Sequence, residues 1–287
     1  MIKDGYDPRK IFTAENRTVV TNIKKGLRGN KWTPIIKKYG VWFIPLTRIP
    51  FVSYQSLRPK FLALKNKKFH VLDSKIFPEG FKIPKFYLEK PIIHLATMKI
   101  HGHTGALGGS LRKTSEEALL IIQKKSYSKI FSTVDGTVCG DGAGPRTMIP
   151  RIKNYILAGY DQVAVDTVVA KMMGFEPLKL PAIRMAHDEG LGCGDFDQIE
   201  IIGEDVSKLN WNFKVKRSIV IWGDQMVRKG ALQFLYPLFK SELFFQGPIY
   251  ASMIYHDMFW YPTIGKHIIK KFLKTEWGQL FASYPRL

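Results

Sequence analysis

Residues 91–98 have the sequence PIIHLATM, an apolar run that predicts a buried β-strand. The Gly-rich segment 99–109 follows this strand, and a capping box at residues 114–117 then opens a predicted helix. A second predicted strand, residues 129–135, runs into another Gly-rich loop at residues 136–145. Strands and helices that alternate in this way predict an α/β fold with a mostly parallel sheet and crossover helices, in three Rossmann-like layers.

The alternation continues beyond the second loop. Asp161 is placed to cap a helix that Gly174 ends. Because ligands bind beyond the carboxyl ends of strands in such sheets, both Gly-rich loops are candidate sites. The further predicted elements are a strand at 155–158, a helix at 162–173, a helix at 181–189 and a strand at 198–203.

The composition is that of a folded protein with a strong basic excess. The 287 residues include 44 Lys+Arg and 24 Asp+Glu, and 45% are hydrophobic, which excludes a collagen, a coiled coil and a wholly disordered chain. The net charge of +20 is uneven. Residues 1–90 hold 20 basic and 6 acidic side chains, residues 91–214 hold 14 of each, and residues 215–287 hold 10 and 4.

This charge distribution and the element pattern predict three regions. Residues 1–85 form a basic N-terminal part of the α/β domain, with strands at 41–46 and 68–73. Residues 86–214 form the α/β core. Residues 215–287 form a helical, aromatic C-terminal extension, with helices predicted at 226–239 and 267–273.

Four ordered motifs within residues 90–205 resemble the large family catalogued as domain of unknown function 362. The first is a strand that leads into Lys-x-His-Gly-x-Thr-Gly, and the second is a strand that ends in Asp before Gly-x-Gly-Pro. The third is a helix that opens Asp-x-Val-Ala-x-Asp and ends Met-Gly, and the fourth is a Gly-Leu-Gly turn. These motifs correspond here to Lys99–Gly105, Asp135 with Gly142–Pro145, Asp161–Gly174, and Gly190–Gly192.

The resemblance implies redox chemistry, because members of the family often carry a ferredoxin-like module with Cys-x-x-Cys-x-x-Cys repeats. This chain has no such repeat, and it lacks the Ile-Lys-Pro-Asn segment with which members usually begin. It therefore looks like a shortened member. A separate ferredoxin-like partner would have to supply the electrons.

Residues that follow or end the two predicted strands are candidates for catalysis. Lys99 is placed to hold a phosphate or carboxylate, and the alternative is a solvated lysine beside a turn. His101 is a candidate acid/base, or with His103 a metal ligand, and the alternative is a polar loop. Asp135 is a candidate catalytic carboxylate or third metal ligand, and the alternative is a cap of the following turn.

The remaining site candidates are supporting or cofactor-binding residues. Asp161 is expected to cap its helix, and Asp166, one turn further on, needs a partner that it anchors or orients. The candidate cofactor-binding residues are Lys99, Gly102, Thr104, Gly105, Gly142 and Gly144.

The two cysteines, Cys139 and Cys193, exclude a disulfide scaffold and a self-contained iron–sulfur cluster, which needs four ligands. Both are expected to be unreactive thiols in a reducing compartment. The sequence identifies no particular cofactor.

Two function classes follow from these features. The first is an enzyme, an oxidoreductase or another cofactor-dependent type, that binds a small anionic ligand at the two Gly-rich loops. The second is a non-enzymatic protein whose basic N-terminal surface binds nucleic acid or an anionic membrane face. A third expectation is that the chain lacks an N-terminal unit and is stable only with a partner.

The N-terminus is charged from Lys3 onward, without the apolar stretch of a secretory signal, which predicts a cytoplasmic protein. The longest charge-poor stretch, residues 243–256, is shorter than the roughly 20 residues that cross a bilayer, so no transmembrane span is expected.

Overall fold

The computed structural model describes residues 1–15, 23–53, 82–101, 106–107, 128–144, 146–235, 247 and 250–284. The chain divides into two compact units. We call Met1–Phe51, Pro84–Phe86 and Lys266–Leu287 the basic unit. We call Val52–Ile83 and Tyr87–Gly265 the sheet unit.

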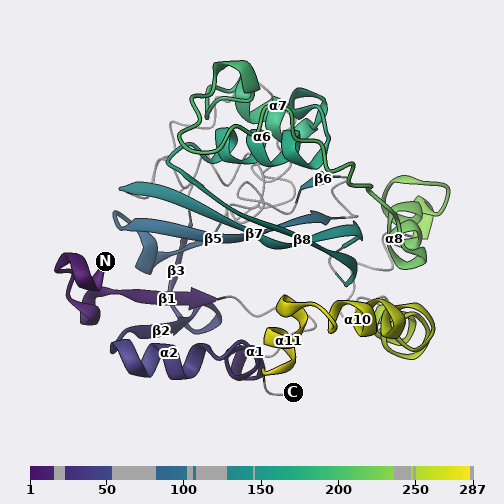
Figure 1. Ribbon diagram of the computed structural model, residues 1–287, viewed down its shortest axis with the longest axis horizontal. Helices are drawn as coiled ribbons and strands as arrows, with labels where there is room; N and C mark the ends of the chain where they lie inside the picture. The colour runs from purple at the N-terminus through teal and green to yellow at the C-terminus, as the bar shows by residue number, and fades with distance from the viewer. Residues whose placement is uncertain are drawn as a thin grey trace. The chain divides into compact units, whose positions relative to one another are not determined.

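The sheet unit is built on a four-stranded sheet with the order β6-β5-β7-β8 (Figure 1). Its strands are β5 (Pro91–His101), β6 (Ala106–Leu107), β7 (Lys129–Ala143) and β8 (Thr147–Gly159). β5 and β7 are parallel, whereas β6 pairs with β5 and β8 pairs with β7 in antiparallel fashion. The α/β class is confirmed, but within the described residues the predicted mostly parallel sheet is wrong, because the sheet is mixed.

The predicted loop at residues 136–145 is also wrong over most of its length. β7 continues to Ala143 and folds back as β8, so the two strands form a long hairpin. Glycine in this segment allows neighbouring side chains to pack closely against the strand, and it does not mark a loop. A Cβ atom added at Gly140 would overlap Sδ of Met148 and lie 3.1 Å from Cβ of Lys99.

Helix α6 (Gln162–Met173) covers one face of this sheet and confirms its prediction (Figure 1). Asp161 caps it, and Gly174 ends it with a φ of 95°. Its apolar side chains pack on alternate residues of β5, because side-chain direction repeats every two residues along a strand. The shared core contains Ala96, Met98, Ile100, Val134, Cys139, Val165, Val169, Met173 and Phe213.

The chain after α6 follows its predictions in part. Helix α7 (Pro181–Asp188) is confirmed. The strand predicted at 198–203 is wrong, because a 3₁₀ helix, Phe196–Gln198, is followed by irregular backbone. Asp195 caps that helix by accepting a hydrogen bond from the Asp197 nitrogen. Ile202 is 93% exposed, so none of the described strands buries this segment.

Two described segments near the end of the sheet unit are helical. Helix α8 (Ile219–Lys229) begins at the Ser218 cap, seven residues before the predicted start at 226, and ends before Gly230. A wide π-helix, η11 (Ile254–Gly265), follows later in the chain. Residues 236–239 of the predicted helix lie outside the described residues, as do the predicted strand 68–73 and the helix expected after residue 117.

The basic unit contains a parallel pair of strands, β1 (Phe12–Glu15) and β2 (Trp42–Pro45), which confirms the strand predicted at 41–46. Two helices lie between these strands in the chain, α1 (Ile23–Gly29) and α2 (Trp32–Tyr39). The C-terminal helices are α10 (Lys266–Phe272), which confirms the helix predicted at 267–273, and α11 (Glu276–Ala282).

A further two-stranded sheet pairs β3 (Phe51–Ser53) with β4 (Lys82–Pro84). No described helix is long and apolar enough to cross a membrane.

Candidate functional site

The carboxyl end of β5 and the tip of the β7–β8 hairpin meet at one end of the sheet. Lys99 is half-buried and lies in register with Gly140. A Cβ atom at Gly144 would overlap the carbonyl oxygen of Ile100, so the hairpin tip closely approaches the last residues of β5. Gly142 has a φ of 91°, which favours glycine. The structure thus brings Lys99, Gly142 and Gly144 to the same end of the sheet.

His101 belongs to the strand rather than to the predicted loop. It is the last residue of β5, is 7% exposed, and lies in register with Ala106 of β6. Gly102, His103, Thr104 and Gly105 lie outside the described residues. Among the residues that the structure describes, no group of three or more His, Cys, Asp or Glu side chains could hold a metal ion.

Asp135 makes local contacts of the kind expected if it caps the following turn, which was the alternative to a catalytic role. Its Oδ1 accepts hydrogen bonds from the backbone nitrogen of Thr137 at 2.9 Å and from Thr137 Oγ1 at 2.7 Å. These bonds span the register shift between Gly136 and Val138 in the pairing of β7 with β8. The carboxylate therefore stabilises a β-bulge in the long hairpin.

The turn of the hairpin carries a cation that the sequence analysis did not single out. Arg146 pairs through Nη2 with Oδ1 of Asp257 at 2.8 Å, and its side chain is 29% exposed. Its Nη1 is buried and has no hydrogen-bond acceptor among the described residues. The sequence signal was its position, directly after the Gly-x-Gly-Pro motif.

His256 lies in the π-helix next to that ion pair. It is 7% exposed, and its Nδ1 bonds to the carbonyl oxygen of Ser252. Burial lowers the pKa of His256, and the positive charge of Arg146 lowers it further, against the opposing effects of Ser252 and Asp257. The imidazole beside Arg146 is thus held toward its neutral form.

A buried carboxylate fixes the same end of the hairpin. Asp141 accepts hydrogen bonds from Nη2 of Arg151 at 2.8 Å and from the backbone nitrogen of Lys214 at 2.9 Å. The hydrogen bond from the Lys214 nitrogen and a β-bridge between Val215 and Gly142 hold the segment after Phe213 to β7. No local pattern in the sequence indicates this role of Asp141, because its partners lie 10 and 73 residues away.

The supporting residues behave as helix and loop anchors. Oδ1 of Asp161 accepts hydrogen bonds from the backbone nitrogens of Val163 and Ala164, at 2.8 and 3.0 Å. Its Oδ2 accepts one from the backbone nitrogen of Cys193 at 2.8 Å. Asp161 is therefore a helix cap, as predicted, that also holds the following loop. Asp166 is buried within α6.

The two cysteines are free and lie in different surroundings. Cys139 is in the core, where its Sγ donates to the carbonyl oxygen of Gly136. Burial raises the pKa of the Cys139 thiol to about 12. Cys193 is half-buried in the loop that Asp161 anchors. Cys139 and Cys193 therefore do not provide the four thiolate ligands that an iron–sulfur cluster needs.

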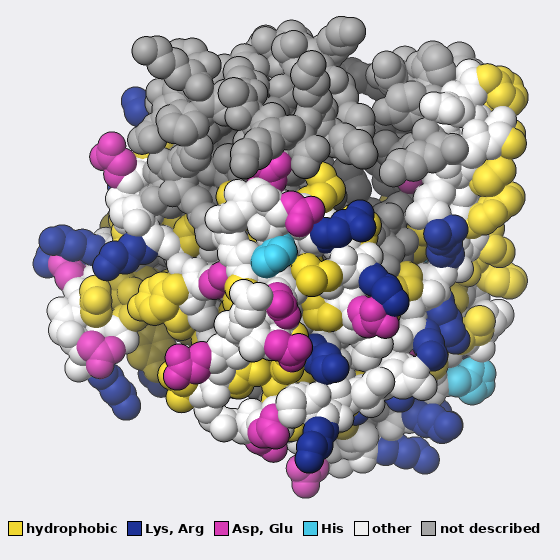
Figure 2. Space-filling model, turned by 90° about the horizontal axis from the view of Figure 1, so that it is seen from above, with side chains coloured by type: hydrophobic (Ala, Val, Ile, Leu, Met, Phe, Trp, Pro, Cys, Tyr) yellow, Lys and Arg dark blue, Asp and Glu magenta, His cyan; other side chains and the backbone are white. Residues whose placement is uncertain are grey.

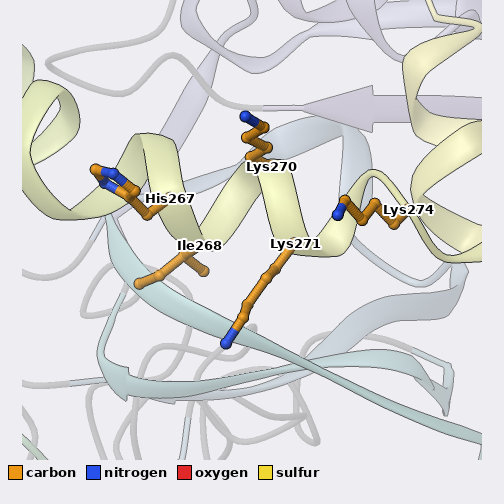
Figure 3. Close-up of a pocket in the computed structure, with 5 residues that line it drawn as sticks. All are labelled: His267, Ile268, Lys270, Lys271 and Lys274. Atoms are coloured by element: carbon orange, nitrogen blue, oxygen red, sulfur yellow. The ribbon is translucent and has the colours of Figure 1, made fainter.

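The basic excess of the chain is concentrated in the basic unit, which contains 17 Lys+Arg and 4 Asp+Glu. His267, Ile268, Lys270, Lys271 and Lys274 line a surface hollow along α10 (Figure 3). By contrast, the view from above onto α6 and α7 shows acidic side chains interspersed among basic ones (Figure 2). The two basic flanks of the sequence thus contribute to one unit.

Comparison with protein-family models, with curated proteins and with solved structures finds no match to this chain.

Proposed function

We propose that the sheet unit binds a small anionic molecule, through a phosphate or carboxylate group, at the carboxyl end of β5 and the tip of the β7–β8 hairpin. The observation that carries this proposal is the buried Nη1 of Arg146, which has no acceptor among the described residues. Lys99 supplies a second positive charge at the same end of the sheet.

The energetic argument starts from the guanidinium group. Its planar fork presents five N–H donors, and in Arg146 only Nη2 has a described partner, Asp257. A buried donor left without an acceptor costs about 1–3 kcal/mol. An oxygen of a bound anion removes that cost and adds a charge-assisted hydrogen bond, which is roughly twice as strong as a neutral one.

The hairpin tip is a suitable support because its backbone is held from two sides. Asp141 binds Arg151 and the Lys214 backbone, and Gly144 approaches Ile100 of β5 too closely for any larger residue. A site that is held in place before the ligand arrives loses less entropy on binding. This favours a binding role for the tip over that of a loose surface turn.

The resemblance to the family extends the proposal to redox chemistry, with His101 as an acid/base group beside the ligand. Because neither Cys139 nor Cys193 fits a cluster ligand set, the electrons would come from a separate ferredoxin-like protein. Purification without oxygen, followed by an ultraviolet–visible spectrum of wild type and H101Q, tests this extension. A chromophore that is lost in H101Q supports it, and a colourless wild type contradicts it.

Anion binding itself is tested by thermal unfolding with inorganic phosphate, pyrophosphate and citrate. Wild type is compared with R146Q and with R184Q, which removes an exposed arginine of α7 as a matched control. We expect at least one of these anions to raise the melting temperature of wild type and R184Q but not of R146Q. Equal shifts in all three proteins would contradict the proposal.

A further inference from the structure

We infer that the basic unit docks on an anionic lipid bilayer, with α10 lying along the membrane surface. This inference is independent of the anion site in the sheet unit, because every residue on which it rests belongs to the basic unit. It starts from the charge of that unit, 17 Lys+Arg against 4 Asp+Glu. A surface of this kind is attracted to the negative potential of anionic lipids.

The arrangement of side chains around α10 matches an interfacial helix. At 100° per residue, Lys266 and Lys270 are neighbours on one side of the helix, and Lys271 and Lys274 continue the basic face. Ile268 and Phe272 are half-buried on the opposite side. The helix therefore has a broad basic face next to its apolar side.

Two further apolar side chains lie between these faces and are exposed. Ile269 and Leu273 are each 39% exposed, and both come one residue before a lysine in the sequence. An exposed apolar flank beside a row of lysines is the pattern of a helix that lies in the headgroup region, with its apolar flank toward the acyl chains. The lysine stems reach the headgroups from the same position.

The lysines of α10 do not converge on a point. In Figure 3 the ends of Lys270 and Lys271 lie apart, as the 100° between successive helix residues requires, and His267 and Lys274 extend toward the two ends of the helix. Such a spread cannot enclose one small ligand in a hollow. It fits an extended anionic surface, which meets each charge separately.

The exposed aliphatic side chains of the other helices suit a lipid surface. Ile35 on α2 is 46% exposed, beside Lys37 and Lys38, and Leu280 on α11 is 47% exposed. Aliphatic side chains do not stack on bases, whereas they gain free energy by leaving water for acyl chains.

Contacts within the basic unit hold these helices together. Lys31, the residue before α2, places Nζ 4.3 Å from the ring centre of Tyr284 and donates to Ser283 Oγ at 3.3 Å, just after α11. The basic and apolar side chains of α2 and α11 are therefore presented by one compact unit.

Sedimentation of the full chain with vesicles tests the inference. The vesicles contain phosphatidylcholine alone, or phosphatidylcholine with phosphatidylserine, at low and high salt. We expect binding only to the vesicles with phosphatidylserine, weakened by salt. Because each lysine near an anionic bilayer contributes about a fivefold increase in affinity, K270Q/K271Q/K274Q should bind about a hundredfold more weakly.

Two further variants separate the contributions of charge and apolar contact. I269S/L273S keeps every charge and should bind about tenfold more weakly, because its apolar flank is lost. K129Q/K208Q/K216Q removes three exposed lysines of the sheet unit as a matched control and should change binding less than about threefold.

Three outcomes would overturn the inference. One is equal binding to both kinds of vesicle, and another is unchanged binding by I269S/L273S. The third is tight binding of a single-stranded RNA oligonucleotide without binding to phosphatidylserine vesicles, which would assign the basic unit to nucleic acid. None of these outcomes alters the effect of R146Q on binding of a small anion.

Discussion

Oδ2 of Asp161 accepts a hydrogen bond from the backbone nitrogen of Cys193 at 2.8 Å, while Oδ1 of the same carboxylate caps helix α6. One side chain thus joins the start of a buried helix to a loop 32 residues later. Gly192 completes this contact, because a Cβ atom there would overlap the Asp161 carboxylate. The Gly190–Gly192 turn and the helix that Asp161 caps are therefore one structural unit.

Replacing Asp161 by Ala should lower the free energy of unfolding by about 3 kcal/mol. Loss of a cap costs about 1 kcal/mol, and a part-buried Cys193 nitrogen left without an acceptor costs about 1–3 kcal/mol more. D161N keeps one acceptor oxygen and should lose about half as much. Urea unfolding followed by circular dichroism measures both values.

The overlap at Gly192 predicts coupling between the two positions. G192A should be destabilising in the wild type, because its Cβ displaces the carboxylate. In a D161A background that carboxylate is absent, so the same substitution should cost clearly less. Additive effects of G192A and D161A in a double-mutant cycle would show that the contact is not as described.

The two thiols should differ in their reaction with iodoacetamide. The pKa of Cys139 is raised to about 12 by burial, so almost no thiolate exists near pH 8, whereas Cys193 is half-buried in a loop. Native protein should therefore be alkylated at Cys193 and spared at Cys139, as read by peptide mass spectrometry. Both should react in guanidinium chloride, and equal native rates would refute the buried position of Cys139.

His256 predicts a loss of stability in acid. Its pKa in the folded protein is lowered, first by burial and then by Arg146, so below the ordinary value of about 6.5 the unfolded chain binds more protons than the folded one. Stability should thus fall as the pH drops from about 7 toward the lowered pKa.

The variant H256Q isolates this contribution. It lacks the titrating group but keeps a side chain that can bond to Ser252, and the charged neighbours Arg146 and Asp257 are unchanged. Its melting temperature should depend less steeply on pH between about 7.5 and 5 than that of wild type. The same slope in both proteins would remove His256 as the cause.

Local signals predicted the elements whose ends are set by neighbouring residues. Helix α6 has its cap at Asp161 and its glycine stop at Gly174, and both were readable in the sequence. The starts of β5 and β7 followed from apolar runs. The ends of these strands could not be predicted in this way, because glycines such as Gly140 and Gly144 are typical of loops. Only the structure shows that Met148 and Ile100 pack closely against them.

The candidate site was predictable to the same extent. The rule that parallel strands present their carboxyl ends together anticipated that Lys99 and residues 142–144 would lie at the same end of the sheet. Arg146 was missed because its importance depends on the hairpin turn and on Asp257, which is 111 residues away. The sequence is compatible with both a catalytic and a turn-stabilising role of Asp135. Only the contacts with Thr137 show the turn-stabilising role.

The most direct test of the anion site is titration calorimetry of pyrophosphate into wild type, R146Q and D257N. A charged hydrogen bond contributes about 1.5–3 kcal/mol, so R146Q should weaken binding about ten- to a hundredfold. D257N removes the carboxylate that competes for Arg146, so it should strengthen binding. Opposite effects of the two substitutions are the predicted result, and an affinity that neither substitution changes would contradict a site at Arg146.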